Sequence, residues 1–113
     1  MEKIFEQLKT YLNMDNEISY EEFSDYYQEV IAYFSKEYEG FDTNTLLNGR
    51  YIASILNANA SERFKRKGPH AKKYKKMAEK ANLWTGALNY RLLEKGMTQE
   101  QIDKAEAEIS SAI

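Results

Sequence analysis

The sequence predicts a compact all-α bundle of four to five helices, folded as a single domain. Only one proline and five glycines interrupt 113 residues rich in Lys, Glu, Ala and Leu, a composition that favours helix. Apolar residues recur at intervals of three and four, and no segment alternates apolar with polar residues as a half-buried strand does. A chain of this length buries enough surface to fold without disulfides, and it has no cysteine to form them.

The N-terminal third predicts two helices. Apolar residues at helical spacing indicate the first over residues 2–12. After a polar break, Ser19 stands three residues before Glu22, the pattern of a capping box that opens a second helix. We expect this helix to run to about Glu39 and to stop at Gly40 in the left-handed conformation.

The third predicted helix occupies the centre of the bundle. It begins at a cap on Asp42 or Thr43 and runs to about Phe64. Its apolar residues fall on several sides, which is typical of a helix enclosed by others. Gly68 and Pro69 then break the pattern, because proline lacks an amide donor and disfavours helix at the preceding residue. The sequence therefore predicts a projecting corner there, together with its lysines.

A fourth helix is predicted over residues 70–95, with Trp84 in the core and Gly96 as its stop. In its first half, the side opposite the apolar stripe is lysine-rich, whereas in its second half that opposite side is apolar as well. A last helix, opened by a capping box of Thr98 and Gln101, is the expected cover for this second apolar side. The second apolar side consists of Leu83, Ala87 and Tyr90.

Charge is sorted along the chain. The N-terminal part, residues 1–42, has 11 acidic against 3 basic residues; the central part, residues 43–82, has 10 basic against 2 acidic. The C-terminal part, residues 83–113, has 5 acidic against 3 basic, so that a formal net charge of −2 hides the separation. Such sorting either forms a basic and an acidic surface for two different partners, or lets the two parts neutralise each other within the fold.

The basic part predicts a binding site for a polyanion. Its side chains flank the Gly-Pro corner and the start of the next helix, where they can neutralise several phosphates of a nucleic acid backbone. Nothing in this segment reads base edges, so we expect DNA or RNA to bind without strong sequence preference. The alternative is a solvated face, or one docked on the acidic third. The candidate nucleic-acid-binding residues are Arg63, Lys65, Arg66, Lys67, His70, Lys72, Lys73, Lys76 and Lys80.

The acidic part predicts a second surface, for a basic protein partner. Carboxylates lie on the side of the second helix away from its apolar stripe, with two tyrosines at the border. Rigid aromatic side chains beside polar groups are common on recognition faces. The alternative is that both tyrosines belong to the boundary of the core. The candidate protein-binding residues are Glu22, Asp25, Tyr26, Glu29 and Tyr33.

The sequence offers no catalytic apparatus. His70 is the only histidine, and no cysteine or glycine-flanked serine provides a nucleophile beside it. Residues 11–23 resemble the exit half of an EF-hand calcium loop, but the first ligand position falls on Tyr11, which cannot bind calcium as aspartate does. We interpret this stretch as a capped helix-loop-helix, and we expect no metal and no cofactor.

Two functions follow from these surfaces. The first hypothesis is a small cytoplasmic accessory or regulatory protein, not an enzyme, that contacts nucleic acid phosphates while its acidic helix faces a protein partner. The alternative is a protein–protein inhibitor or adaptor, of the kind carried by phages and mobile elements, acting through the acidic helix. We expect no membrane association, because no leader pattern and no apolar run of about 18 residues is present. The oligomeric state stays open.

Overall fold

The computed structural model describes residues 1–113 and consists of five α-helices without a strand, which confirms the predicted all-α bundle. A single 3-10 turn, Tyr38–Gly40, follows the second helix. The helices are α1 (Glu2–Leu12), α2 (Tyr20–Glu37), α3 (Thr43–Lys65), α4 (Ala71–Glu94) and α5 (Gln99–Ser111).

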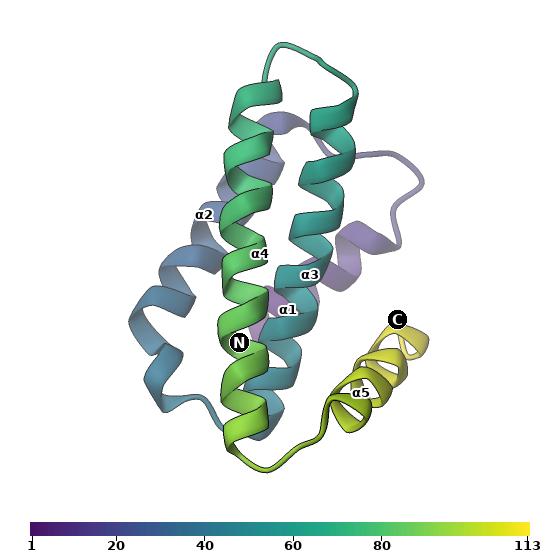
Figure 1. Cartoon of the computed structure of the whole chain (residues 1–113). Helices are drawn as coiled ribbons and strands as arrows, with labels where there is room; N and C mark the ends of the chain where they lie inside the picture. Colours follow the sequence, from purple (N-terminus) through teal and green to yellow (C-terminus); the bar gives the residue numbers. More distant parts are fainter.

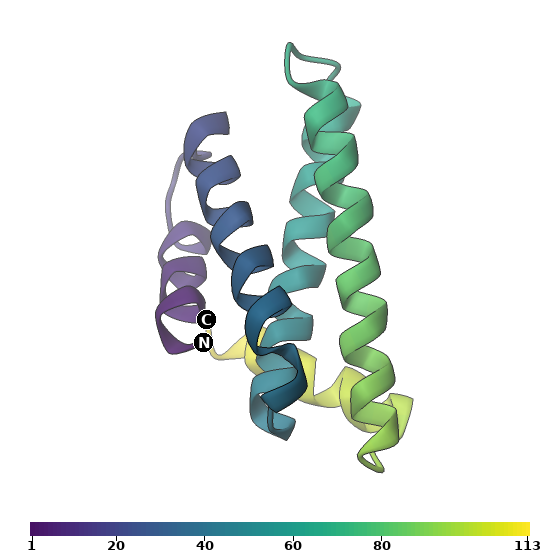
Figure 2. The same ribbon diagram turned by 90° about the vertical axis from the view of Figure 1, so that its left-hand side faces the viewer.

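The two longest helices form an antiparallel hairpin that runs the length of the molecule (Figure 1). Figure 2 shows α2 along one side of this hairpin, with α1 on the outer side of α2. The α5 helix crosses the end of the hairpin that lies opposite the α3–α4 corner. The corner therefore projects beyond the other helices, as predicted from Gly68 and Pro69.

The core lies between α2, α3 and α4, and α3 has buried residues on several sides, as expected of a central helix. Burying a large apolar side chain contributes roughly 1.5–3 kcal/mol, so this set dominates the stability of the fold. Trp84 lies at the edge of the core rather than inside it, with its ring centroid 5.4 Å from that of Phe34. The largest fully buried side chains are Val30, Phe34, Leu46, Ile52, Leu88, Leu92 and Ile102.

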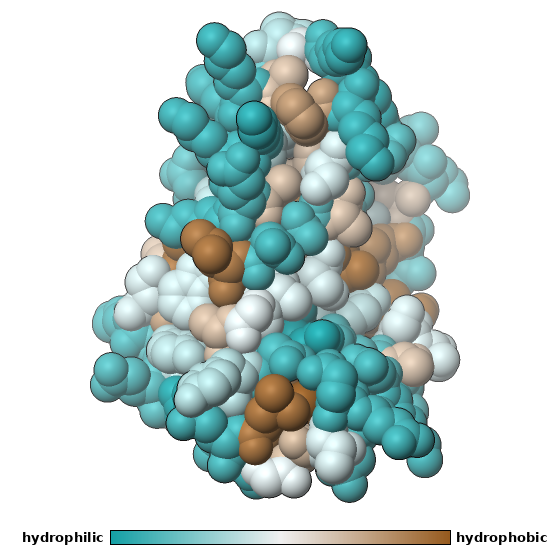
Figure 3. Space-filling model, viewed as in Figure 1, coloured by the Kyte–Doolittle hydropathy of each residue, from teal (hydrophilic) through white to brown (hydrophobic).

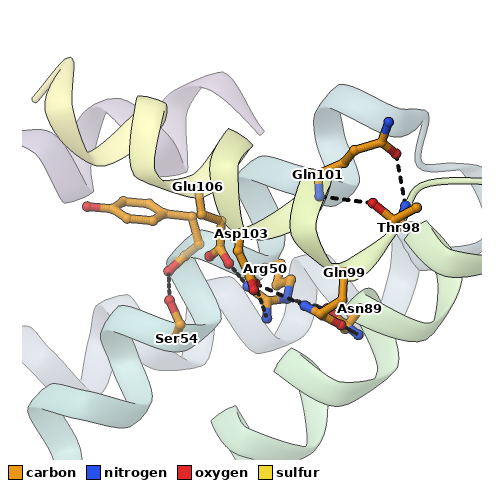
Figure 4. A network of polar contacts seen from close by, with 9 residues as sticks. Arg50, Ser54, Asn89, Thr98, Gln99, Gln101, Asp103 and Glu106 are labelled. Atoms are coloured by element: carbon orange, nitrogen blue, oxygen red, sulfur yellow. Dashed lines mark hydrogen bonds and ion pairs between the residues drawn. The ribbon is translucent and has the colours of Figure 1, made fainter.

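Side-chain caps begin three of the helices. The Ser19 hydroxyl accepts a hydrogen bond from the Glu22 amide (3.1 Å), and an Asp42 carboxylate oxygen accepts one from the Thr45 amide (2.8 Å). At Thr98 the box with Gln101 is complete in both directions (Figure 4). Each cap satisfies amide groups that the first turn leaves unpaired. Of the two predicted boxes, the first forms only its hydroxyl half.

The end of α2 differs from the prediction. Gly40 does not adopt the left-handed conformation; among the glycines only Gly96 has a positive φ, 98°, and it ends α4 as predicted. Instead, α2 tightens into a 3-10 turn in which the Tyr38 hydroxyl donates a hydrogen bond to the Ala87 carbonyl (3.2 Å). This tertiary bond fixes the turn without a left-handed residue.

The position of α5 also differs from the prediction. It does not cover the second apolar side of α4, where Leu83 and Tyr90 stay exposed. The reason is Arg50 on α3, whose guanidinium is mostly buried and pairs with Glu106 and, at 4.0 Å, with Asp103 of α5 (Figure 4). A buried guanidinium is stable only with carboxylate partners, and these ion pairs hold α5 against α3.

Candidate nucleic-acid interface at the α3–α4 corner

The predicted basic residues gather at one end of the hairpin, which we call the basic corner (residues 63–80, the end of α3, the connecting turn and the start of α4; Figure 1). Lys67, rather than Gly68, takes the left-handed conformation that ends α3, with φ of 53°. The Lys67 amide donates to the Phe64 carbonyl (3.1 Å), and the Ala71 amide to the Gly68 carbonyl (3.1 Å). Two consecutive turns thus bring the ends of α3 and α4 together.

The lysines of the basic corner are exposed, and none of them lies within 4.0 Å of a carboxylate. Polar side chains accordingly dominate the upper half of the face in Figure 3. Lys75, which was not among the candidates, belongs to the same exposed group. The unpaired predicted lysines are Lys65, Lys67, Lys72, Lys73, Lys76 and Lys80.

Arg63 is not part of this surface, and the expectation that it contacts phosphate is wrong. Its side chain is 8% exposed, with Nη1 donating to the Tyr74 hydroxyl (2.9 Å) and Nη2 to the Ile18 carbonyl (2.9 Å). The Nε atom lies 3.0 Å from a Glu17 oxygen, close enough for an ion pair but not aligned for a hydrogen bond. Arg63 therefore anchors the corner from below.

Arg66 is exposed but already has a partner. Its Nη1 donates to both oxygens of Glu17, at 2.8 and 2.7 Å. The Arg66 hydrogen bond is the main reason why the pKa of Glu17 is lowered; partial burial opposes it, and the charge of Arg63 adds to it. One carboxylate thus serves two guanidiniums. Glu17 therefore neutralises the charge of the two arginines, whereas the lysines of the basic corner have no carboxylate partner.

His70 lies at the edge of the basic corner. Its ring stacks on that of Tyr20, with centroids 3.8 Å apart and planes 7° from parallel. The ammonium of Lys73 lies 5.5 Å from the centroid of the same Tyr20 ring. One face of the imidazole is therefore covered by the Tyr20 ring, and the side chain stays partly exposed.

The acidic candidates on α2 separate into exposed and buried residues. Glu22, Asp25 and Glu29 are exposed as predicted, and Tyr33 is half-buried with its ring stacked on Phe41. The placement of Tyr26 on a recognition face is wrong, because this side chain is buried and its hydroxyl donates to the Ile4 carbonyl (2.8 Å).

The register of the α2 stripe explains the burial of Tyr26. The helical spacing of the sequence predicts a buried stripe of Phe23, Tyr27, Val30, Ile31, Phe34 and Tyr38. The structure instead buries Phe23, Tyr26, Val30 and Phe34. Both stripes have helical spacing, so periodicity alone could not choose between them. Burial also raises the pKa of the Tyr26 hydroxyl.

Other features of the surface are less suited to a ligand. One hollow, of about 330 Å³, is lined in part by the α1–α2 loop and mixes apolar walls with Asp15, Glu17 and the two arginines already described. No three His, Asp or Glu side chains are grouped to hold a metal ion. Within the EF-hand-like residues 11–23, Ser19 caps α2 and Glu17 binds the arginines. None of the helices is long and apolar enough to cross a membrane.

Sequence reasoning missed Glu17. Its ion pairs with Arg63 and Arg66 determine which basic side chains of the corner remain free to contact a phosphate. Glu17 lies in a polar break 49 residues before Arg66, and no short-range pattern links the two.

Comparison with known proteins adds no assignment: no family model, no curated protein and no solved structure matches the chain.

Proposed function

We propose that the protein binds nucleic acid through phosphate contacts at the basic corner, without strong sequence preference and without catalysis. The observation that carries the proposal is the set of exposed lysines that have no carboxylate partner, beside arginines that do. An unpaired ammonium gives up only a counterion when it meets a phosphate, and the release of that counterion drives association. Lysine acts as a mobile point charge, which suits contact with a backbone better than recognition of a base edge.

The arrangement of these lysines supports contact with more than one phosphate. Lys72, Lys76 and Lys80 follow one another at intervals of four on α4, and so lie about 6 Å apart along one side of the helix. Lys65 and Lys67 extend the charge across the turn. Only Glu79 within the corner, with Glu17 and Glu62 beside it, opposes nine basic residues. A positive field of this kind also speeds the encounter with a polyanion.

The alternative, a protein-binding function of α2, has weaker support. With Tyr26 buried, the acidic face retains Glu22, Asp25, Glu29 and the half-buried Tyr33. Carboxylates without an exposed aromatic anchor make a poor centre for a protein interface, since binding energy concentrates in such anchors. We therefore place the acidic face second.

Fluorescence anisotropy with labelled single-stranded and duplex DNA and RNA tests the proposal, at low and at physiological salt. We expect binding that weakens steeply as salt rises, and a variant with Lys72, Lys73 and Lys76 changed to Glu that no longer binds. The matched control changes Lys36, Lys95 and Lys104 to Glu, which alters the net charge equally but away from the corner. Circular dichroism checks that both variants keep their helices.

Two results would overturn the proposal. One is the absence of binding to any of the four nucleic acids even at low salt. The other is an equal loss of binding in both triple variants, because net charge rather than the basic corner would then account for the affinity.

A further inference from the structure

The outer face of the second half of α4 carries large apolar side chains that no part of the chain covers. Leu83 is 73% exposed, Tyr90 63% and Leu93 42%. Gly86 lies between them, and a Cβ atom added there meets nothing within 4 Å. Apolar side chains stand out over the lower part of α4 in Figure 3, and no other helix crosses this face in Figure 1. We call Leu83, Gly86, Tyr90 and Leu93 the outer seam.

The outer seam has the spacing of a coiled-coil seam. Its intervals of three, four and three residues match the alternating a and d positions of a heptad. The buried residues of the same stretch, Ala81, Leu88 and Leu92, take other heptad positions and pack on the core. The second half of α4 is therefore built to contact helices on two sides, and its own chain supplies only one.

We propose that a second copy of this chain covers the outer seam, with the two α4 helices antiparallel and related by a two-fold axis near Leu88. In antiparallel pairs an a position faces a d position of the other helix. Leu83 then packs against Leu93 of the second copy, and Tyr90 against Gly86 of the second copy. Each contact occurs twice, as an interface between identical surfaces requires.

Charge along the outer seam favours a second copy in this orientation. Lys80 and Glu94 flank the seam at its two ends, both exposed and both outside every ion pair of the chain. They occupy equivalent flanking positions, one heptad on either side of Ala87. In the antiparallel dimer each Lys80 therefore faces Glu94 of the other copy, which forms two ion pairs. A parallel pair would instead bring Lys80 near Lys75 of the other copy and Glu94 near Asn89 of the other copy, and would form no ion pair at either end.

Gly86 is consistent with the same contact. Glycine inside an exposed helix destabilises it relative to alanine, and nothing in this chain requires the space. In the antiparallel dimer that space receives the ring of Tyr90 from the second copy. The glycine thus has a packing role between chains that it lacks within one.

The dimer is expected to be weak and to carry two distant basic corners. A seam of about three helical turns buries less than a standard stable interface, so association depends on protein concentration. Counting 1.5 Å per residue from Leu88 to the start of each α4 places the two corners roughly 50 Å apart, at opposite ends. Dimerisation does not rest on the proposed function and is tested without nucleic acid.

Sedimentation velocity over a concentration series tests the dimer. The unaltered protein is expected to shift from monomer to dimer as its concentration rises. Leu83→Glu and Gly86→Leu, made separately, are each expected to weaken dimerisation more than tenfold, since the first buries a charge and the second fills the space for Tyr90. Met14→Glu, at an exposed apolar side chain of the α1–α2 loop, is the matched control and leaves the shift unchanged.

Charge exchange distinguishes a second copy from any other partner and fixes the orientation. Lys80→Glu alone and Glu94→Lys alone are each expected to weaken dimerisation roughly tenfold, because two ion pairs become two repulsions. An equal mixture of the two variants restores the dimer, since every facing pair is again of opposite charge. A protein that stays monomeric at all concentrations, a dimer insensitive to Leu83→Glu, or a mixture that fails to recover would each overturn the proposal.

Discussion

Arg63 Nη1 donates a hydrogen bond to the Tyr74 hydroxyl across 2.9 Å, joining the last turns of α3 to the first turn of α4 beneath the basic corner. Both side chains are buried. The same guanidinium binds the Ile18 carbonyl and pairs with Glu17, so three segments meet at one charge. The lysines above it project because this buried group holds the corner in place.

Removing the buried guanidinium is expected to destabilise the fold. Arg63→Met leaves the Tyr74 hydroxyl and the Ile18 carbonyl without partners, at a cost of about 3 kcal/mol in the free energy of unfolding. Tyr74→Phe removes one bond and costs about 1–2 kcal/mol. Urea unfolding measures both variants. Arg66→Met, which removes an exposed guanidinium from the same cluster, is the control and changes stability little; an equal effect of the two arginine variants would contradict the anchoring role of Arg63.

The Glu17 cluster predicts a loss of stability in acid. Because the pKa of Glu17 is lower in the folded chain than its ordinary value of 4.5, its contribution is fully present above that value. The contribution is lost as the pH falls through the lowered pKa, where the carboxylate is protonated and releases the two arginines. Melting temperatures over pH 2 to 7, a range set around the ordinary carboxyl pKa of about 4, are therefore expected to fall less steeply for Glu17→Gln than for the unaltered protein. Glu79→Gln, at an exposed carboxylate outside any ion pair, should keep the original slope.

Local chemistry made the helix starts predictable, and long-range contacts made two site residues unpredictable. The caps at Ser19, Asp42 and Thr98 depend on partners three residues away, which the sequence displays directly. The burial of Tyr26 and of Arg63 depends on carbonyls 22 and 45 residues distant, whose proximity exists only in the fold.

The outer face of α4 marks a second limit of sequence reasoning. Periodicity correctly identified Leu83 and Tyr90 as an apolar side of the helix. It could not reveal that α5 would follow Arg50 onto α3 and leave that side open. Whether α5 covers the apolar side of α4 depends on which contacts of α5 are more stable. Here the ion pair with the buried Arg50 places α5 on α3 instead.

The structural role of Tyr26 can be separated from a role in recognition. Tyr26→Phe leaves the Ile4 carbonyl unpaired inside the core and is expected to cost about 1–2 kcal/mol of unfolding free energy. Tyr33→Phe removes a hydroxyl that bonds to nothing in the chain, so it should be nearly neutral. Thermal and urea unfolding compare the two variants, and a neutral Tyr26→Phe would show that the hydroxyl does not stabilise the fold.

The attachment of α5 is expected to depend on Arg50. Partial burial lowers the pKa of its guanidinium, which Asp103 opposes, and the carboxylates of α5 keep the charge tolerable inside the fold. Glu106→Ala removes the main carboxylate, leaving Asn89 and the more distant Asp103. Hydrogen exchange should then accelerate across α5 by roughly tenfold or more while α3 and α4 stay protected. Glu108→Ala, an exposed carboxylate on the same helix, is the control, and equal acceleration in both variants would contradict this account.

Two glycines of opposite conformation are expected to respond oppositely to alanine. Gly86 lies inside α4 with open space at the position of a Cβ atom, so Gly86→Ala should raise the free energy of unfolding by about 0.5–1 kcal/mol. Gly96 has φ of 98°, which disfavours any side chain, so Gly96→Ala should lower it by roughly 1–2 kcal/mol. Urea unfolding at low protein concentration isolates these effects from dimerisation. A change of the same sign in both variants would contradict the assignment of Gly96 as the left-handed stop of α4 and of Gly86 as an ordinary helical residue within the single chain.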